Sequence, residues 1–238
     1  MNKQNKTLFY GGLKDGIPIA LGYLSVSFGF GISAVNSGLS PFAAVLISLT
    51  NLTSAGQMAG LDVIVALGTL FEMVLTQFTI NIRYFLMSLS LSQKLDKSFT
   101  LPHRLLASFG ITDEVFGVAS SKKESIKPIY MYGLILLPFI GWSLGTLLGA
   151  IAGNILPSDL KNALGIAIYG MFVAIVLPPA KRDKGVAVAS LLSIAVSLAL
   201  AFIPIFSFVT SGFAIIIAAV VAAVVAALLF PIKEDDEQ

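Results

Sequence analysis

Long, uninterrupted apolar blocks recur along the chain and decide its class before any other feature. They cover residues 17–35, 41–49, 61–91, 129–155, 163–177, 186–206 and 212–232. Several reach the roughly 20 residues that a helix needs to cross a bilayer, and their continuity excludes a barrel of alternating strands. Charged residues make up only 12% of the sequence, about half the share of a soluble domain. The sequence therefore predicts an all-α polytopic integral membrane protein with a single domain over 1–238.

Lys and Arg residues predict which helix ends face the cytoplasm, because they gather in cytoplasmic loops. Twelve of the fifteen lie in three places: three before residue 15, six from 94 to 127 and three from 181 to 184. If all three places are cytoplasmic, an even number of crossings separates each pair. We therefore predict a multi-pass protein of the cytoplasmic membrane, with a cytoplasmic N-terminus, a retained first span and a cytoplasmic amphipathic-helix loop at about 93–128.

The segment 41–60 does not fit this parity as a full span. Its second half, LTNLTSAGQMAG, is rich in Thr, Asn, Ser, Gly and Gln. Backbone that leaves the helix at membrane depth is tolerated only inside protein or beside a cavity. We therefore predict six full transmembrane helices plus a broken or re-entrant segment at 41–60. The alternative is seven full spans, which would place the 93–128 loop outside.

The stretch FEMVLTQFTINIRYFL, residues 71–86, carries polar side chains within an apolar block. On a helix, Glu72, Thr76 and Arg83 share one stripe, and Asn81 lies on roughly the opposite side. An ionisable side chain at the bilayer centre costs about 2.5–3.5 kcal/mol on insertion scales, so it normally faces protein or water. These residues are candidates for a substrate or proton pathway, with Glu72 carrying a proton or meeting an ammonium. The alternative is a structural role for both charges, or an Arg83 that extends to the membrane interface.

Gln57 lies in the polar half of the segment 41–60, and it is the next candidate for the pathway. Broken helices in transporters expose free N–H groups that bind a substrate carboxylate. The alternative is an ordinary polar seam between helices.

Two acidic residues in the loop, Asp113 and Glu114, complete the candidate set. The sequence predicts two short helices there, one that starts near Pro102 and stops at Gly110 and one capped by Thr112. Acidic residues in a first turn stabilise a helix, so capping is the plain role of this pair. Their charge also makes them candidates for the substrate or proton pathway.

Glycines recur every fourth residue in IGWSLGTLLGAIAGN, at Gly141, Gly145, Gly149 and Gly153. Such a ridge lets another helix approach closely. It predicts helix packing, either within the chain or against a partner subunit.

The sequence offers no chemistry beyond this. It contains no cysteine and a single histidine, so thiolate metal sites are absent. No nucleotide-binding loop, metal cluster or catalytic triad is present, and the net charge of +2 does not indicate nucleic-acid binding. We therefore predict neither an enzyme nor a bound cofactor or metal.

Several stretches together resemble the AzlC family, the large subunit of bacterial branched-chain amino acid exporters. They occur in the family's order and cover nearly the whole chain: PIALGYLSVSFGFGI (18–32), SAGQMA (54–59), NIRYFLMSLSL (81–91), FGITDEVFG (109–117), GWSLGTLLGAIAG (141–153) and LGIAIYGMFVAIVLPP (164–179). By that resemblance Gln57, Asn81, Arg83, Asp113 and Glu114 occupy family motif positions. Family members often carry His where this chain has Tyr84.

The resemblance implies a secondary transporter that exports hydrophobic amino acids together with a small membrane subunit of the AzlD type. The expected function is export of branched-chain or similar hydrophobic amino acids across the cytoplasmic membrane, coupled to protons. The expected partners are that small subunit, the amino-acid substrate, protons and the lipid bilayer. The alternative is an uncoupled channel or uniporter for small amphipathic solutes.

Overall fold

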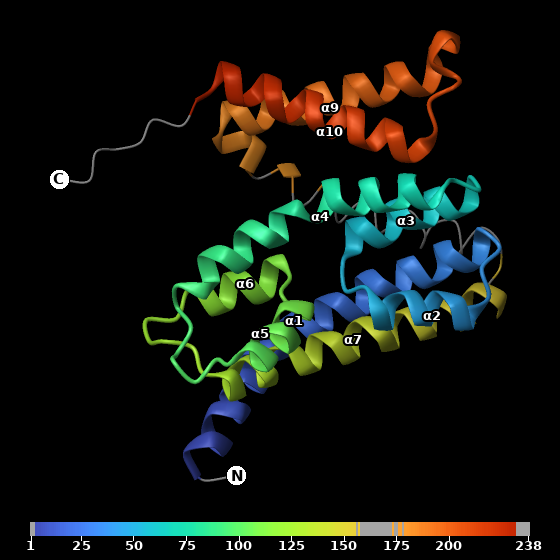
Figure 1. The fold of residues 1–238 in the computed structure, drawn as a ribbon. Helices are drawn as coiled ribbons and strands as arrows, with labels where there is room; N and C mark the ends of the chain where they lie inside the picture. The colour runs from blue at the N-terminus through green and yellow to red at the C-terminus, as the bar shows by residue number, and fades with distance from the viewer. Residues whose placement is uncertain (1–2, 156, 158–172, 174–175, 178, 232–238) are drawn as a thin grey trace. The chain divides into compact units, whose positions relative to one another are not determined.

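The computed structural model describes residues 3–155, 157, 173, 176–177 and 179–231 (Figure 1). Within these residues the chain is helical, apart from turns and a single isolated bridge between Leu95 and Ile126. Four of the described helices are long and apolar enough to cross a membrane: α1 (Lys3–Asn36), α7 (Pro128–Ile155), α9 (Lys184–Phe202) and α10 (Ser211–Leu229). The all-α class predicted from the sequence is confirmed. The full span count stays a prediction, since most of the apolar block 163–177 lies outside the described residues.

The chain divides into two compact units. The first comprises residues 1–58 and 81–168, and the second comprises residues 59–80 and 169–238. Each unit has its own polar contacts.

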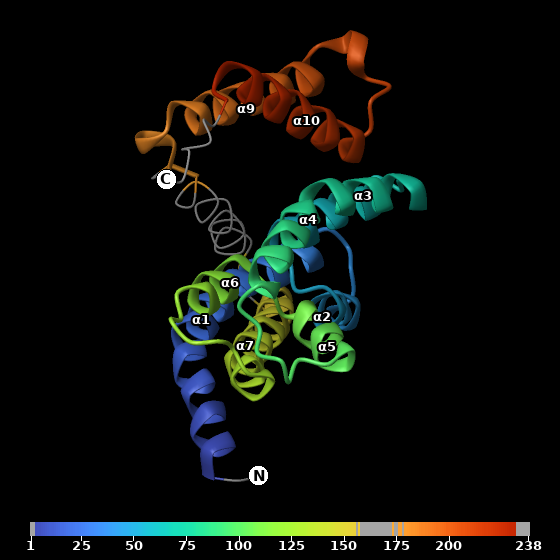
Figure 2. The ribbon, with the colours of Figure 1, turned by 60° about the vertical axis from the view of Figure 1, so that its left-hand side comes forward.

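The first unit is built on the pairing of α1 with α7, which run together along their length (Figures 1 and 2). Glycines make this close approach possible. A Cβ atom on Gly16 would lie 2.7 Å from the Leu134 carbonyl oxygen, and one on Gly141 would lie 2.5 Å from the Ala20 carbonyl oxygen. A side chain at either position would therefore push the helices apart.

The glycine ridge of α7 lies on the face that contacts α1. Gly145 lies against Leu24 and Ser27, and Gly149 lies against the backbone of Phe28. Gly153 belongs to the same helix, but its packing lies outside what the structure describes. The ridge makes a contact within the chain, one of the two roles that its spacing predicts.

The segment 41–60 is a broken helix. Helix α2 (Pro41–Thr50) starts at the N-cap Ser40, whose side chain accepts from the Ala43 N–H, and Asn51 then turns to an extended conformation. Helix α3 (Ser54–Val65) resumes after three non-helical residues. The predicted break is confirmed, whereas the depth of this segment in the membrane stays a prediction.

The apolar block 61–91 is not one continuous helix, contrary to its reading as a single block. Helix α3 ends at Val65, and α4 (Leu70–Ser92) begins after a short turn. Leu67 adopts a positive φ of 54° in this turn, and the Thr69 hydroxyl then accepts from the Glu72 N–H at 3.1 Å. Thr at the N-cap with Glu three residues later is a helix-start signal that the apolar composition concealed.

The loop between α4 and α7 contains the two predicted short helices, α5 (Leu101–Phe109) and α6 (Asp113–Ser120). Gly110 ends the first and Thr112 caps the second, as the sequence predicts. The two ends of the loop are tied by backbone hydrogen bonds of 2.9 Å between the strand-like residues 94–96 and 126. These ties hold α5 and α6 against the α1–α7 pair.

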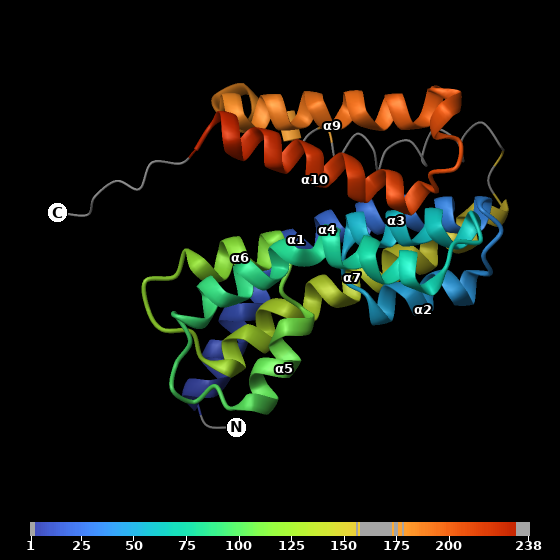
Figure 3. The same ribbon diagram turned by 45° about the horizontal axis from the view of Figure 1, so that its top comes forward.

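In the second unit, α9 and α10 pack against each other as an antiparallel pair (Figure 3). Helix α9 (Lys184–Phe202) and helix α10 (Ser211–Leu229) match the apolar blocks 186–206 and 212–232 of the sequence. The connection between them includes a short 3-10 turn, Pro204–Phe206, and Asp183 caps α9 by accepting from the Val186 N–H at 3.0 Å.

Candidate functional site

A buried chain of hydrogen bonds in the first unit centres on Gln57, at the start of α3. The Trp142 indole N–H donates to Gln57 Oε1 at 2.7 Å, and Gln57 Nε2 donates to the Ser48 hydroxyl at 2.9 Å. Ser48 is in turn 2.8 Å from the Thr146 hydroxyl. All four side chains are at most 2% exposed. Because buried polar groups need partners, this chain fixes Gln57 between α2 and α7.

A second polar cluster is joined to the first by two aromatic rings. Trp142 makes an edge contact with Tyr23 of α1, with ring centroids 5.2 Å apart. The Tyr23 hydroxyl lies 2.6 Å from the Thr112 hydroxyl and also donates to the Glu114 carboxylate. Tyr23 therefore connects the broken helix to the start of α6.

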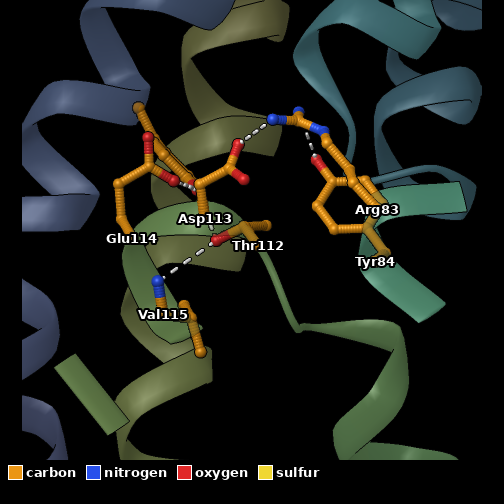
Figure 4. Close-up of polar contacts among 7 residues, drawn as sticks. Arg83, Tyr84, Thr112, Asp113, Glu114 and Val115 are labelled. Carbon is orange, nitrogen blue, oxygen red and sulfur yellow. Dashed lines mark hydrogen bonds and ion pairs between the residues drawn. The ribbon is translucent and has the colours of Figure 1, made fainter. Parts of the chain in front are cut away.

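An ion pair lies beside this cluster, where α4 meets α6 (Figure 4). Arg83 Nη1 is 2.6 Å from the Asp113 carboxylate, and both side chains are about half exposed, at 44% and 46%. The Arg83 guanidinium also lies over the Tyr84 ring and donates to its hydroxyl at 3.3 Å. Figure 4 shows the Asp113 carboxylate directed at Arg83, with Glu114 turned to the other side of α6.

The surroundings of Asp113 raise the pKa of its carboxyl. Partial burial raises the pKa of its carboxyl above the ordinary value, and the charge of Arg83 opposes this rise. The neighbouring Glu114 carboxylate adds to the increase. The charge of Arg83 thus favours the ionised form of the Asp113 carboxyl.

Glu72 and Thr76 belong to the second unit and have different partners. Glu72 is 1% exposed; its carboxylate accepts from the Gly212 N–H at 2.9 Å and from the Thr210 hydroxyl. It thereby stabilises the N-terminus of α10, a position that favours negative charge. Thr76 is fully buried close by, and its hydroxyl has no hydrogen-bond partner among the described residues.

The predicted pathway residues therefore form three groups. Gln57 lies in the buried chain, Arg83, Asp113 and Glu114 lie around the start of α6, and Glu72 and Thr76 lie at the start of α10. Asn81 lies partly buried on α4, in sequence between Thr76 and Arg83. Thr112 is the N-cap of α6 and accepts from the Val115 N–H at 3.4 Å, while Asp113 and Glu114 lie in the first turn, where negative charge stabilises a helix.

Sequence reasoning missed several members of these groups: Tyr23, Ser48, Tyr84, Trp142 and Thr146. A buried Tyr or Trp generally finds a partner for its polar atom, so Tyr23 and the single Trp142 inside apolar blocks were the available signals. Ser48 and Thr146 gave none. In the part of the chain that the structure describes, no cluster of three or more acidic or histidine side chains could hold a metal.

Comparison with known proteins supports the membrane class and gives a family. The family model described as "AzlC protein" matches residues 18–156. An "Uncharacterized membrane protein" of Archaeoglobus fulgidus is 34% identical over 73% of this chain and 77% of its own length. The "Inner membrane protein YgaZ" of Escherichia coli is 28% identical over 77% of this chain and 78% of its own. An "Uncharacterized membrane protein" of Helicobacter pylori is 25% identical over 73% of this chain and 78% of its own length. No solved structure matches the chain at a significant level.

Proposed function

The chain belongs to the AzlC family of membrane proteins, and from that premise we propose that it exports branched-chain or similar hydrophobic amino acids. It acts in the cytoplasmic membrane, with its N-terminus on the cytoplasmic side. The AzlC resemblance supports the substrate class, and the described geometry supports a solute that carries two charges.

The Arg83–Asp113 ion pair is the observation that carries this proposal. Its two side chains are about half exposed, and exposed ion pairs contribute only about 0–1 kcal/mol. An amino acid can therefore compete for both partners, with its carboxylate at Arg83 and its ammonium at Asp113. Glu114 lies next to Asp113 and adds negative charge for the ammonium.

Glu72 is the proposed site of proton coupling. A buried carboxylate is the group that a proton gradient can discharge inside a membrane protein. Protonation of Glu72 would weaken its acceptance from Thr210 and from the Gly212 N–H, and so would release the start of α10. Proton binding would in this way change the structure of the second unit.

A small membrane subunit of the AzlD type is the proposed partner. The AzlC resemblance alone supports this step, and co-expression tests it directly. Many large apolar side chains on the described helices are exposed, among them Leu101, Leu105 and Leu106 of α5. A lipid bilayer and a second membrane subunit are the surroundings that such side chains fit.

Leucine efflux tests the function. The chain is reconstituted into liposomes loaded with labelled leucine, with or without the small subunit of its own genome, and efflux is followed with and without a proton gradient. Efflux that needs both subunits and increases with protons moving in the opposite direction supports the proposal. Efflux that ignores the gradient indicates an uncoupled channel or uniporter, and no efflux of any branched-chain amino acid overturns the substrate class.

A further inference from the structure

A cavity of about 140 Å³ lies at the interruption between α2 and α3. It is bordered by the break itself, by α4 and by the end of α5 with the turn that follows. Its lining residues are Thr50, Asn51, Leu52, Thr53, Tyr84, Ser108, Phe109 and Ile111. All of them belong to the first unit. A water molecule occupies about 30 Å³ of the liquid, so the cavity has room for the polar end of a small metabolite.

Two hydroxyl groups of the residues that line this cavity are not fully hydrogen-bonded within the described part of the chain. The Thr53 hydroxyl is completely buried and has no partner among the described residues. The Tyr84 hydroxyl accepts from Arg83, but its own proton has no acceptor in the described part of the chain. Buried polar groups in proteins are nearly always paired. A bound ligand would supply the missing partners.

The helix break supplies complementary charge. Thr50 ends α2 and Thr53 directly precedes α3. Helix C-termini carry partial negative charge and helix N-termini partial positive charge. Partial charges of both signs therefore lie within the four residues from Thr50 to Thr53. The Asn51 side chain can both donate and accept. A ligand with an ammonium and a carboxylate on neighbouring atoms matches this arrangement.

The remaining wall of the cavity is apolar, with Leu52, Phe109 and Ile111. Polar groups on one side and apolar groups on the other are typical of a small-molecule site. An α-amino acid with a hydrocarbon side chain likewise has a polar end, with its ammonium and carboxylate, and an apolar end.

We propose that this cavity is a second recognition site for the exported amino acid, beside the Arg83–Asp113 pair. Here the α2–α3 break, Thr53 and Tyr84 hold the ammonium and carboxylate as the amino acid moves to or from that pair. The inference rests on the proposed function and deepens it. Tyr84 gives the cavity its connection to the Arg83–Asp113 pair, because its ring lies under the Arg83 guanidinium at 4.9 Å. Binding at Tyr84 therefore acts on the ion pair.

Binding of labelled L-leucine to the purified full-length protein, co-expressed with its small subunit, tests this site. Tyr84→Phe and Thr53→Val each remove one hydroxyl and keep the size of the side chain. Each is expected to raise the Kd for leucine about tenfold, the usual effect of losing a hydrogen bond to a charged group. Thr53→Ser keeps the hydroxyl and is expected to bind as the unmodified protein does.

Two matched controls lie outside the cavity. Tyr10→Phe removes a hydroxyl from a Tyr that is 66% exposed on α1, and Thr7→Val removes one that donates to the Lys3 carbonyl on the same helix; both are expected to leave the Kd unchanged. Isocaproate lacks the ammonium of leucine and isoamylamine lacks its carboxylate, so neither is expected to compete with leucine.

The outcomes separate this inference from the proposed function. Unchanged leucine affinity in both cavity variants would overturn the inference even if efflux occurs. Affinity that falls in both variants supports the site, even if reconstituted protein shows no efflux, in which case the export function is wrong. Absence of amino-acid binding to the unmodified protein would overturn both.

Discussion

Trp142 donates its indole N–H to the side-chain oxygen of Gln57 over 2.7 Å, with both side chains almost completely buried. This bond connects α7 to the first turn of α3, immediately after the helix break. Trp142→Phe would leave the Gln57 oxygen buried without a donor, which costs about 1–3 kcal/mol. We expect a lower Tm in detergent, measured by the loss of monodisperse protein after heating.

A double variant controls for the smaller size of Phe. Gln57→Leu in the Trp142→Phe background removes the unsatisfied oxygen, so part of the lost Tm should return. A double variant less stable than Trp142→Phe alone would show that losing the bond from Gln57 to Ser48 costs more than the unsatisfied oxygen.

The Arg83–Asp113 pair should matter for transport far more than for stability. Exposed pairs contribute about 0–1 kcal/mol, so Asp113→Asn is expected to leave the Tm within a few degrees of the original. Leucine efflux should fall at least tenfold, because the ammonium loses a charged partner. Arg83→Lys keeps the charge but not the planar geometry of the guanidinium, so it should reduce leucine efflux less than Asp113→Asn does. Equal efflux in all three proteins would remove the pair from the site.

The pH dependence of efflux should reflect Asp113. Burial raises the pKa of this carboxyl, and the Arg83 charge opposes the rise. The charged pair exists above that pKa and is lost as the pH falls through it. Efflux measured without a proton gradient should therefore decline on acidification, starting at a higher pH than an exposed Asp would allow. Asp113→Asn should abolish this decline, and a decline that persists in the variant would assign it to another group.

Substitution of a glycine by alanine should lower thermal stability only where that glycine lies at the contact between α1 and α7. Gly149→Ala places a Cβ against the Phe28 backbone, and overpacking of this kind typically costs about 1–3 kcal/mol. Gly22 lies on α1 with nothing within 4 Å of a new Cβ. Gly22→Ala should therefore be neutral or slightly stabilising, since alanine favours helix. Thermal stability in detergent compares the two, and equal Tm values would contradict close packing at Gly149.

Glu72 should be needed for the response of leucine efflux to a proton gradient but not for efflux itself. Glu72→Gln removes the charge while keeping a side chain that can accept from Gly212 and Thr210. We expect efflux of leucine to continue but to lose its response to an imposed proton gradient, measured in the same liposomes. An unchanged response would leave Glu72 with only its role at the start of α10.

The sequence was informative where local chemistry decides structure. Pro102, Gly110 and Thr112 predicted the limits of α5 and α6, and the polar residues around Asn51 predicted the interruption between α2 and α3. The turn before α4 was missed because its start signal, Thr69 with Glu72, lies within continuous apolar sequence.

Partners distant in sequence could not be predicted in this way. The stripe argument placed Glu72 and Arg83 on one face, but Glu72 binds the start of α10 and Arg83 binds Asp113. The spacing along a helix says which way a side chain points, whereas the contact depends on which helix lies opposite. Tyr23 and Glu114 are 91 residues apart and meet for this reason.

The glycine contact between α1 and α7 also bears on how the first unit can move. Where backbone lies directly on backbone, few side chains are available to exchange rotamers as one helix slides along the other. These two helices are therefore expected to act as a fixed frame during a transport cycle. The three non-helical residues after Thr50 and the turn around Gly110 interrupt the helices. They are therefore the natural hinges for any rearrangement around that frame.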